Sequence, residues 1–395
     1  MKLTATDLLP MVIDLVRDEL AQLRNSSPLD MDSRRWSADT PIGGEAIDAD
    51  SIELIHLVTA CAERFGLQEL DAGDYLLRQR TLGEWAELAA TGLEHTGALT
   101  FRTSGTTGEP HPHRHRLADL EQEVTALTEL LTDTRRIVSL VPSHHIYGCL
   151  MTILLPKVLN CPVVHDRDGS GRLPSDLAAG DRLIGFPLRW RQLLAGRPTF
   201  PTGIEAVTST APCPTETVEA LYNIGIERVV AIYGATETGG VGYRTVPEAP
   251  YRLFDHWQWH DDQLWRTHAD AEGATPYTPQ DSLSFVDERH FHPLGRRDGV
   301  VQVAGTNVHP DAVAARLNEH PLVADCAVGL DRTGEPRLTA RIVLTPDADP
   351  GNAEAELRRW TRSNLRTPER PAVLTFVDKL PRSAMGKPLG WQESA

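Results

Sequence analysis

The chain has 395 residues, more than one ordinary compact core requires, so two or three domains are expected. Its 55 acidic and 39 basic side chains give a formal net charge of -16. This balance argues against binding nucleic acid through phosphate neutralisation and favours a small-molecule or protein partner. The five cysteines have no CxxC spacing, which argues against disulfides or structural zinc and fits a cytoplasmic protein.

The first quarter of the chain differs chemically from the rest. Residues 1–97 contain 18 acidic and 8 basic side chains, so they carry -10 of the net charge of -16. The spacing of apolar residues predicts a helix over residues 5–23, but Asp7, Asp14 and Asp18 interrupt it, so it is not a signal peptide. No apolar run approaches the roughly 20 residues that span a bilayer. The sequence therefore predicts no membrane span.

Two more helices are predicted before residue 98. The first ends at Gly66 and places Ile52, Ile55, Val58 and Phe65 on one apolar face. A shorter one follows in "TLGEWAEL". Residues 1–97 are therefore predicted to form a separate all-α domain.

From residue 98 the pattern changes to short β-branched segments that alternate with helical ones. This alternation predicts a layered α/β core with a largely parallel sheet over residues 98–297. A smaller α+β domain is predicted over residues 298–395. The expected core strands lie in "RIVSLVP", "CPVVH", "DRLIGFP", "IEAVTST" and "ERVVAIYG".

The stretch "TSGTTGEP" at residues 103–110 combines small hydroxylated residues with glycine. The backbone amides and hydroxyls of such a loop can surround phosphate oxygens, because glycine permits close approach. It lacks the GxxxxGK[ST] spacing of the Walker loop, so that mechanism is not implied. The stretch indicates a phosphate-binding loop of another kind.

This loop resembles the phosphate loop of the adenylate-forming superfamily, which includes acyl-CoA synthetases and the adenylation domains of nonribosomal peptide synthetases. Further stretches resemble motifs of that superfamily and occur in the same order. They are "VPSHHIYG" (141–148), "VTSTAPCP" (207–214), "YGATETGG" (233–240), "TPQDSLSF" (278–285), "GRRDGVVQVAGTNVHPDAV" (295–313) and "LPRSAMGKPLG" (380–390).

The resemblance implies roles for individual residues in binding ATP and Mg²⁺. Glu237 is expected to bind Mg²⁺ beside Thr236, and Lys387 to stabilise charge in the transition state. Asp298 is the expected hinge of a mobile C-terminal domain. The expected nucleotide-binding residues are Thr103, Ser104, Gly105, Thr106, Thr107, Gly108, Tyr233, Gly234, Asp281 and Arg296.

The resemblance also implies where the acid substrate binds. The expected lining residues are His145, Tyr147, Thr210 and Ala211, with Phe186 and Trp190 as weaker candidates. Aromatic residues at such positions are often plain core, which is the alternative interpretation.

The stretch "DADSIELIHL" raises a second question, because Ser51 stands where a helix begins. A serine there is by default an N-cap. The short acidic helical region also resembles acyl carrier proteins, in which such a serine carries phosphopantetheine. Ser51 is by that resemblance the expected attachment site, and a carrier retained only for docking is the alternative.

The chain departs from the superfamily in several respects. The long subdomain that usually precedes the phosphate loop is missing, and the carrier-like region takes its place. His111, Thr210 and Gln302 stand where relatives often have lysine, glycine and lysine. The combination resembles the AMP ligases of aryl polyene and xanthomonadin-type pigment pathways.

The sequence therefore predicts an ATP-dependent ligase that activates a carboxylic acid, of hydroxybenzoate type by resemblance, to an acyl-adenylate. The acyl group is expected to pass to the phosphopantetheine thiol of a carrier protein, either on Ser51 or on a separate chain. One alternative is an acyl- or aryl-CoA ligase. Another is a non-catalytic carrier or docking protein with a degenerate adenylation domain. The sequence leaves the acid and the oligomeric state open.

Overall fold

The computed structural model describes residues 1–24, 26, 33–43, 46–70, 73–102, 111–166, 173–196, 198–296, 300–331, 336–346 and 348–380. These residues fall into two compact units. The first contains residues 1–102, 112–279 and 283–293, and the second contains His111, residues 280–282 and the described residues from 294 onward. Among the described residues, no helix is both long and apolar enough to cross a membrane.

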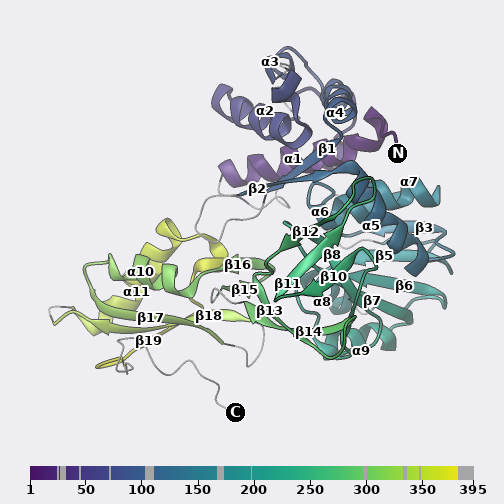
Figure 1. Cartoon of the computed structure of the whole chain (residues 1–395). Helices are drawn as coiled ribbons and strands as arrows, with labels where there is room; N and C mark the ends of the chain where they lie inside the picture. Colours follow the sequence, from purple (N-terminus) through teal and green to yellow (C-terminus); the bar gives the residue numbers. More distant parts are fainter. Residues whose placement is uncertain are drawn as a thin grey trace. The chain divides into compact units, whose positions relative to one another are not determined.

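The N-terminal part of the first unit is helical, as predicted. The side chain of Thr4 caps the first helix, and that of Thr81 caps the last. Figure 1 shows these helices in purple and blue on one side of the β1–β2 hairpin. They are α1 (Ala5–Leu23), η2 (Ser33–Arg35), α2 (Ser51–Phe65), η3 (Leu67–Leu70), α3 (Gly73–Leu76) and α4 (Leu82–Thr96).

Helix α1 packs into the body of the first unit. All seven residues from 11 to 17 are buried, and seven residues make about two turns, so the helix is covered on every side. Its apolar residues belong to the same core cluster as Phe101, Met151 and Trp257. Asp14 and Arg17 of this helix are also buried. The predicted boundary at residue 97 thus falls inside one compact unit, and a single hydrophobic cluster extends across it.

Helix α2 ends at Gly66 as predicted, in the left-handed conformation with φ 67°. Its buried side includes Leu57, Val58 and Phe65. The prediction that Ile52 and Ile55 face the core is wrong, because their side chains are 68% and 58% exposed.

A nine-stranded sheet forms the centre of the first unit's body, with β5, β6 and β7 in teal in Figure 1. Its order is β13-β14-β9-β8-β7-β6-β5-β3-β4. The strands are β3 (Arg136–Ser139), β4 (Val163–His165), β5 (Asp181–Gly185), β6 (Ile204–Thr208), β7 (Ile226–Ala235), β8 (Gly239–Arg244), β9 (Tyr251–Leu253), β13 (Asp281–Phe285) and β14 (His290–Arg296).

The sheet is parallel on one side and antiparallel on the other. The parallel pairs join β3, β4, β5, β6 and β7, the strands predicted from the sequence. The antiparallel pairs begin where β7 meets β8 and continue to β9 and β14. The description as largely parallel therefore holds for one side only.

The other elements of this body are helices, a hairpin and a small sheet. They are β1 (Ala98–Arg102), β2 (Pro112–Arg116), α5 (Leu117–Leu130), α6 (Ile146–Cys149), η4 (Leu150–Leu154), α7 (Leu155–Leu159), α8 (Pro187–Ala195), α9 (Thr215–Asn223), β10 (Trp257–His260), β11 (Gln263–Thr267) and β12 (Ala274–Tyr277).

The second unit has its own core, which includes Leu317, Val328, Ile342 and Leu357. Its β17-β18-β19 sheet is mixed, since β17 and β18 pair antiparallel and β18 and β19 pair parallel. The elements are β15 (Val301–Val303), β16 (Thr306–Val308), α10 (Pro310–Asn318), β17 (Val323–Asp331), β18 (Arg337–Leu344), α11 (Pro350–Asn364), η5 (Thr367–Glu369) and β19 (Val373–Phe376). The predicted small α+β fold agrees with these elements.

Candidate functional site

The carboxyl ends of the parallel strands carry several predicted site residues. Residues 143–145 follow β3, Thr210 and Ala211 follow β6, and Tyr233 and Gly234 lie near the end of β7. Parallel strands present their carboxyl ends at one edge, where ligands of open α/β sheets usually bind. The fold therefore brings residues far apart in the sequence to a shared edge.

The turn after β7 contains Thr236, Glu237 and Thr238. Its geometry requires glycine at residue 234, since a Cβ there would lie 2.2 Å from the carbonyl oxygen of Gly239. The backbone N–H of Ala235 donates to the hydroxyl of Thr238 at 3.2 Å, which closes the turn. Thr236 and Glu237 are half-buried at this turn. A carboxylate and a hydroxyl are thus held together on a short, closed segment.

His115 links this turn to the hairpin that carries the predicted phosphate loop. Its Nε2 lies 2.7 Å from the carbonyl oxygen of Thr236, and a carbonyl only accepts, so Nε2 is the protonated nitrogen. Burial lowers the pKa of His115 to about 4, so the ring is neutral at pH 7. The residue lies on β2, which pairs with β1 across the predicted loop.

Two buried residues with ionisable side chains, Arg266 and Glu123, form hydrogen bonds with the segment that follows β7. Arg266 donates to the carbonyl oxygens of Thr238 at 3.0 Å and Asp119 at 2.7 Å. Glu123 accepts from the N–H of Gly240 at 2.7 Å, and burial raises the pKa of its carboxyl to about 7. No sequence motif identifies Arg266, Glu123 or His115. The "HRHR" run was the one available signal, and it identified no particular histidine.

Thr210 has a positive φ of 73° in the turn after β6. This left-handed conformation is common for glycine and strained for a β-branched residue. The structure thus gives a physical reason why glycine would suit this position. Thr210 is exposed, and the neighbouring Ala211 is half-buried.

The predicted acid-pocket residues fall into two groups. The His145 side chain is exposed at the start of α6. Tyr147 is buried, and its hydroxyl lies 2.8 Å from the carbonyl oxygen of Val207 and 3.2 Å from that of Gly185, so it joins β5 and β6. Trp190 is completely buried in the core and Phe186 is half-buried. The plain-core interpretation therefore describes Trp190.

Helix α1 holds the turn that presents His145. A carboxylate oxygen of Asp14 accepts from the backbone N–H of Ser143 at 2.7 Å and also bonds to the Ser143 hydroxyl. Arg17 lies 3.1 Å from the other oxygen of Asp14. The His144 ring stands 3.4 Å from the Asp18 carboxylate. The N-terminal region thus forms one wall behind a predicted acid-binding residue.

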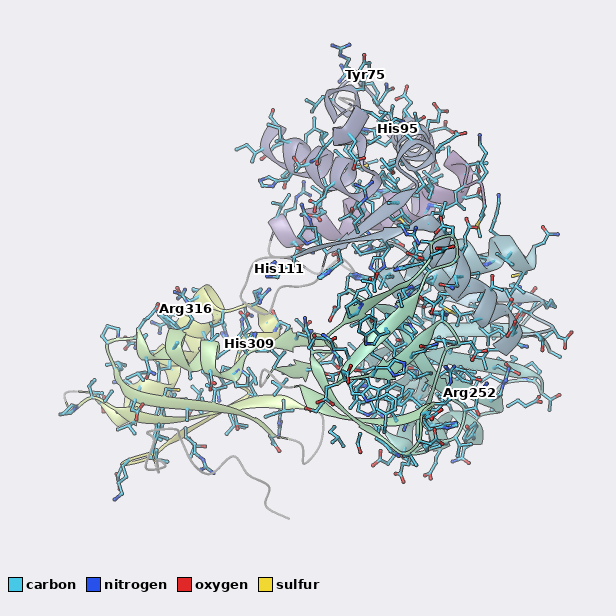
Figure 2. The ribbon with its side chains drawn as sticks, viewed as in Figure 1. Tyr75, His95, His111, Arg252, His309 and Arg316 are labelled. Atoms are coloured by element: carbon cyan, nitrogen blue, oxygen red, sulfur yellow. The ribbon has the colours of Figure 1, made fainter. Side chains whose placement is uncertain are left out.

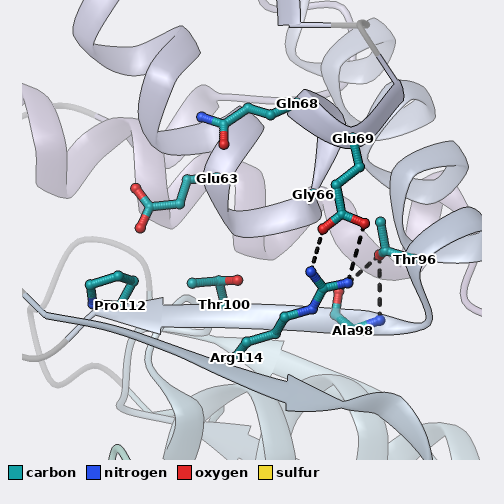
Figure 3. A pocket seen from close by; sticks show the side chains of 9 residues that line it. All are labelled: Glu63, Gly66, Gln68, Glu69, Thr96, Ala98, Thr100, Pro112 and Arg114. Atoms are coloured by element: carbon teal, nitrogen blue, oxygen red, sulfur yellow. Dashed lines mark hydrogen bonds and ion pairs between the residues drawn. The ribbon is translucent and has the colours of Figure 1, made fainter.

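The same region also contacts the hairpin. Glu63 pairs with Arg102, and Glu69 pairs with Arg114. A pocket of about 390 Å³ lies between α2, η3 and the hairpin, and both glutamates line it (Figure 3). The two strands that lead into and out of the predicted phosphate loop are therefore both tied to N-terminal helices.

Asp50, and not Ser51, caps α2, since its side chain accepts from the N–H groups of Ile52 and Glu53. Ser51 is the first helical residue and is exposed. The default interpretation of Ser51 as an N-cap is therefore wrong.

The remaining predicted site residues are only partly described. Asp281 is the first residue of β13 and is half-buried. Arg296 ends β14, and its side chain lies outside the described residues. Also outside them are Thr103, Ser104, Gly105, Thr106, Thr107, Gly108, Asp298 and Lys387.

The chain matches two protein-family models. Residues 90–308 match the model described as "AMP-binding enzyme", and residues 312–387 match "AMP-binding enzyme C-terminal domain". The two matches together cover the predicted core and most of the predicted C-terminal domain.

Similar proteins extend along almost the whole chain. A 4-coumarate–CoA ligase of Halorhodospira halophila is 38% identical over 98% of this chain and 99% of that relative. Another, from Cereibacter sphaeroides, is 35% identical over 89% of this chain and 86% of its own. The amide bond synthetase of Marinactinospora thermotolerans shares the fold, with a TM-score of 0.61 at 18% identity over 96% of this chain and 92% of its own.

Proposed function

This chain belongs to the AMP-binding enzyme family and is an acid–thiol ligase, and from that premise we propose that it joins an aromatic acid of the hydroxycinnamate class to coenzyme A. One observation carries the proposal. The 4-coumarate–CoA ligase relative aligns over 99% of its own length, N-terminal region included. We propose this acid class in preference to the hydroxybenzoate type implied by the resemblance to the pigment-pathway ligases.

The proposed reaction has two steps. A carboxylate oxygen of the acid attacks the α-phosphorus of ATP, the bond to the β-phosphate oxygen breaks, and pyrophosphate leaves. The thiol of coenzyme A then attacks the acyl carbon, and AMP leaves as the thiol proton passes to solvent. The first step brings two anions together, so charge neutralisation is its main requirement.

The described residues fit a magnesium ion at the turn after β7. A carboxylate and a hydroxyl offer the hard oxygen ligands that Mg²⁺ prefers, and both Glu237 and Thr236 are half-buried there. When bound, Mg²⁺ neutralises charge on the phosphates of ATP. We assign Glu237 as its ligand and Thr236 as a hydroxyl contact.

We assign the remaining nucleotide contacts by the same family resemblance. The loop at residues 103–108 would hold the phosphates, Tyr233 and Gly234 would face the adenosine, and Asp281 with Arg296 would hold the ribose. Lys387 would supply the positive charge at the forming bond, and Asp298 would be the hinge of the C-terminal unit. His115 supports this assignment, because it joins the loop's hairpin to the Glu237 turn at 2.7 Å.

The acid would bind beside the exposed His145, with Thr210 and Ala211 on the neighbouring turn and Tyr147 shaping the wall from within. The contacts of Asp14 with Ser143 support this proposal, because they fix the backbone that presents His145. Helix α1 would in this way replace part of the subdomain that is missing before the phosphate loop.

Coenzyme A is a better candidate for the thiol than a carrier on this chain. Residues of α1, α2 and α4 share a continuous core with the body, so they do not form a free-standing bundle. The carrier hypothesis stays a prediction that depends on Ser51. Membership of a ligase family also disfavours a non-catalytic docking protein.

A direct assay tests the proposed function. The purified chain is supplied with ATP, Mg²⁺ and coenzyme A, and with 4-coumarate, 4-hydroxybenzoate or a fatty acid in parallel. We expect AMP release and thioester absorbance to be largest with 4-coumarate. Equal rates without any acid, or a clear preference for the fatty acid, would falsify the substrate assignment.

The carrier hypothesis needs a separate experiment. The chain is incubated with coenzyme A and a phosphopantetheinyl transferase, and its intact mass is measured. We expect no mass gain in the wild-type chain. A gain of one phosphopantetheine that disappears in Ser51→Ala would establish the carrier instead.

A further inference from the structure

We infer that Asp18, His144 and His145 form a binding site for one divalent transition-metal ion of the zinc class. All three residues belong to the first compact unit. Asp18 lies on α1, and the two histidines lie in the turn before α6. Each side chain offers one ligand atom, and the three atoms all lie within 4.8 Å of one another.

The spacing requires only small side-chain rotations to bind an ion. Nε2 of His144 is 3.4 Å from Oδ2 of Asp18. The two imidazole centroids are 4.2 Å apart, with their planes at 39°. A tetrahedral zinc ion with ligand bonds of about 2.0–2.2 Å separates its ligand atoms by about 3.3–3.6 Å. The Asp18–His144 distance already matches this range.

His144 is the observation that points to a ligand. Its side chain is buried, its Nδ1 has no hydrogen-bond partner among the described residues, and its Nε2 faces only the Asp18 carboxylate at 3.4 Å. A buried imidazole with so few polar contacts is costly, and a metal bond would reduce that cost. His145 is exposed on the neighbouring position, so an ion can reach the site from water.

The support around the histidines is rigid. Asp14 binds both the backbone N–H and the hydroxyl of Ser143, and Arg17 lies against Asp14. These buried contacts fix the backbone immediately before the first histidine. A metal site has a higher affinity when neighbouring hydrogen bonds already hold its ligands in place, because binding then costs less conformational entropy.

The ligand chemistry selects the class of metal. Two imidazoles and one carboxylate suit Zn²⁺, Co²⁺ and Ni²⁺, whereas Mg²⁺ and Ca²⁺ prefer oxygen ligands throughout. Glu19 and Arg64 both act electrostatically on this cluster, with opposite signs. Among the three ligands of the cluster, Asp18 is the carboxylate and can supply a negative charge. The competing state is a direct contact between Asp18 and His144 without a metal ion.

A bound ion would connect α1 to the turn before α6. It would also occupy His145, so zinc should inhibit acid activation in competition with the acid and not with ATP. That consequence rests on the proposed function. The binding itself does not, since it needs neither ATP nor an acid.

The experiment uses the full chain, freed of metal by a chelator and then dialysed. Zn²⁺ is titrated by calorimetry and Co²⁺ by visible absorption, in the absence of nucleotide and acid. We expect one equivalent to bind in the wild type, and Mg²⁺ not to compete. In Asp18→Asn and His144→Ala the affinity should fall at least about tenfold. The control His95→Ala removes an exposed histidine on α4 (Figure 2) and should bind like the wild type.

Two results would overturn the inference. The first is the absence of saturable binding at one equivalent in the wild type. The second is wild-type affinity in Asp18→Asn, which keeps the shape of the side chain and therefore carries the test if His144→Ala does not fold. Failure of the ligase assay leaves these results unaffected, so the two proposals fail separately.

Discussion

The N-terminal region and the C-terminal unit are both predicted from the sequence to be separate domains, but they are stabilised differently. The C-terminal unit has its own core around Leu317 and Leu357. The N-terminal helices share their core with the body, and α1 is buried on all sides between residues 11 and 17. One region is independent in its packing, and the other is a structural part of the body.

This difference shows that charge and composition do not predict how a segment packs against the rest of a protein. An excess of acidic residues describes the surface of a segment and says nothing about what its apolar residues pack against. The sequence of helix α1 contains a feature that indicates packing against the body. Asp14 and Arg17 lie within an apolar run, and a helix covered all round needs partners on more than one side.

The largest expected effect is on the contact that joins α1 to the body. In Asp14→Ala the N–H of Ser143 and the guanidinium of Arg17 lose a buried partner, which should lower the free energy of unfolding by about 3–5 kcal/mol. Calorimetry should show the transition of the first unit moving down while that of the second unit stays. Glu94→Ala removes an exposed pair with Lys2 and serves as the control. If Asp14→Ala moves neither transition, the shared core is less important than the contacts suggest.

The second effect concerns a buried carboxyl in the first unit. The pKa of Glu123 is raised from 4.5 to about 7 by burial, so the folded chain retains a proton that the unfolded chain releases. Between pH 4.5 and 7 this group therefore reduces stability as pH rises, by about 3 kcal/mol in total. Glu123→Gln cannot ionise and still accepts from Gly240. The free energy of unfolding of Glu123→Gln, relative to that of the wild type, should therefore increase by about 3 kcal/mol between pH 4.5 and 7.

Urea unfolding at a series of pH values measures this difference. Glu129→Gln, an exposed glutamate on the same helix, should follow the wild-type profile. Parallel profiles for Glu123→Gln and the wild type would show that Glu123 does not titrate in this range. The transition of the C-terminal unit should be insensitive to either change.

A third effect separates chemistry from stability. Lys387→Ala should lower acyl-adenylate formation about 100-fold, close to 3 kcal/mol of activation free energy, because the role that we propose for Lys387 is to supply a positive charge at the reacting phosphorus. Pyrophosphate exchange measures it, and both thermal transitions should stay in place. Lys379→Ala changes an exposed lysine nearby in the sequence and should keep full activity. Unchanged exchange in Lys387→Ala would remove this residue from its role.

Much of the fold could be predicted, since periodicity and capping are local. The end of α2 at Gly66 and the five parallel strands follow from short stretches of sequence. Ile52 and Ile55 were assigned to the wrong side of α2 because helical spacing identifies an apolar stripe and not its partner. The antiparallel strands β9 to β12 are not predicted because each has only three to five residues, too few for alternation to identify a strand.

The sequence predicts those residues of the candidate site that belong to a recognisable motif. Glu237 and Gly234 are found in this way, and the close approach of Gly239 explains the glycine. His115, Glu123 and Arg266 could not be found, because their partners Thr236, Gly240 and Thr238 are far away in the sequence. Long-range contacts between buried polar groups leave no local pattern.

The smallest expected effect tests the strained turn after β6. Thr210 adopts φ 73°, which costs a β-branched residue about 1–3 kcal/mol. Thr210→Gly relieves that strain but adds freedom to the unfolded chain, so the net gain should be about 1 kcal/mol. The first unit's transition should rise by about 2 °C, and the second unit's should not move. Thr202→Gly, at another exposed threonine, should give no such gain. A loss of stability in Thr210→Gly would mean that contacts of the threonine side chain outweigh the strain of its backbone.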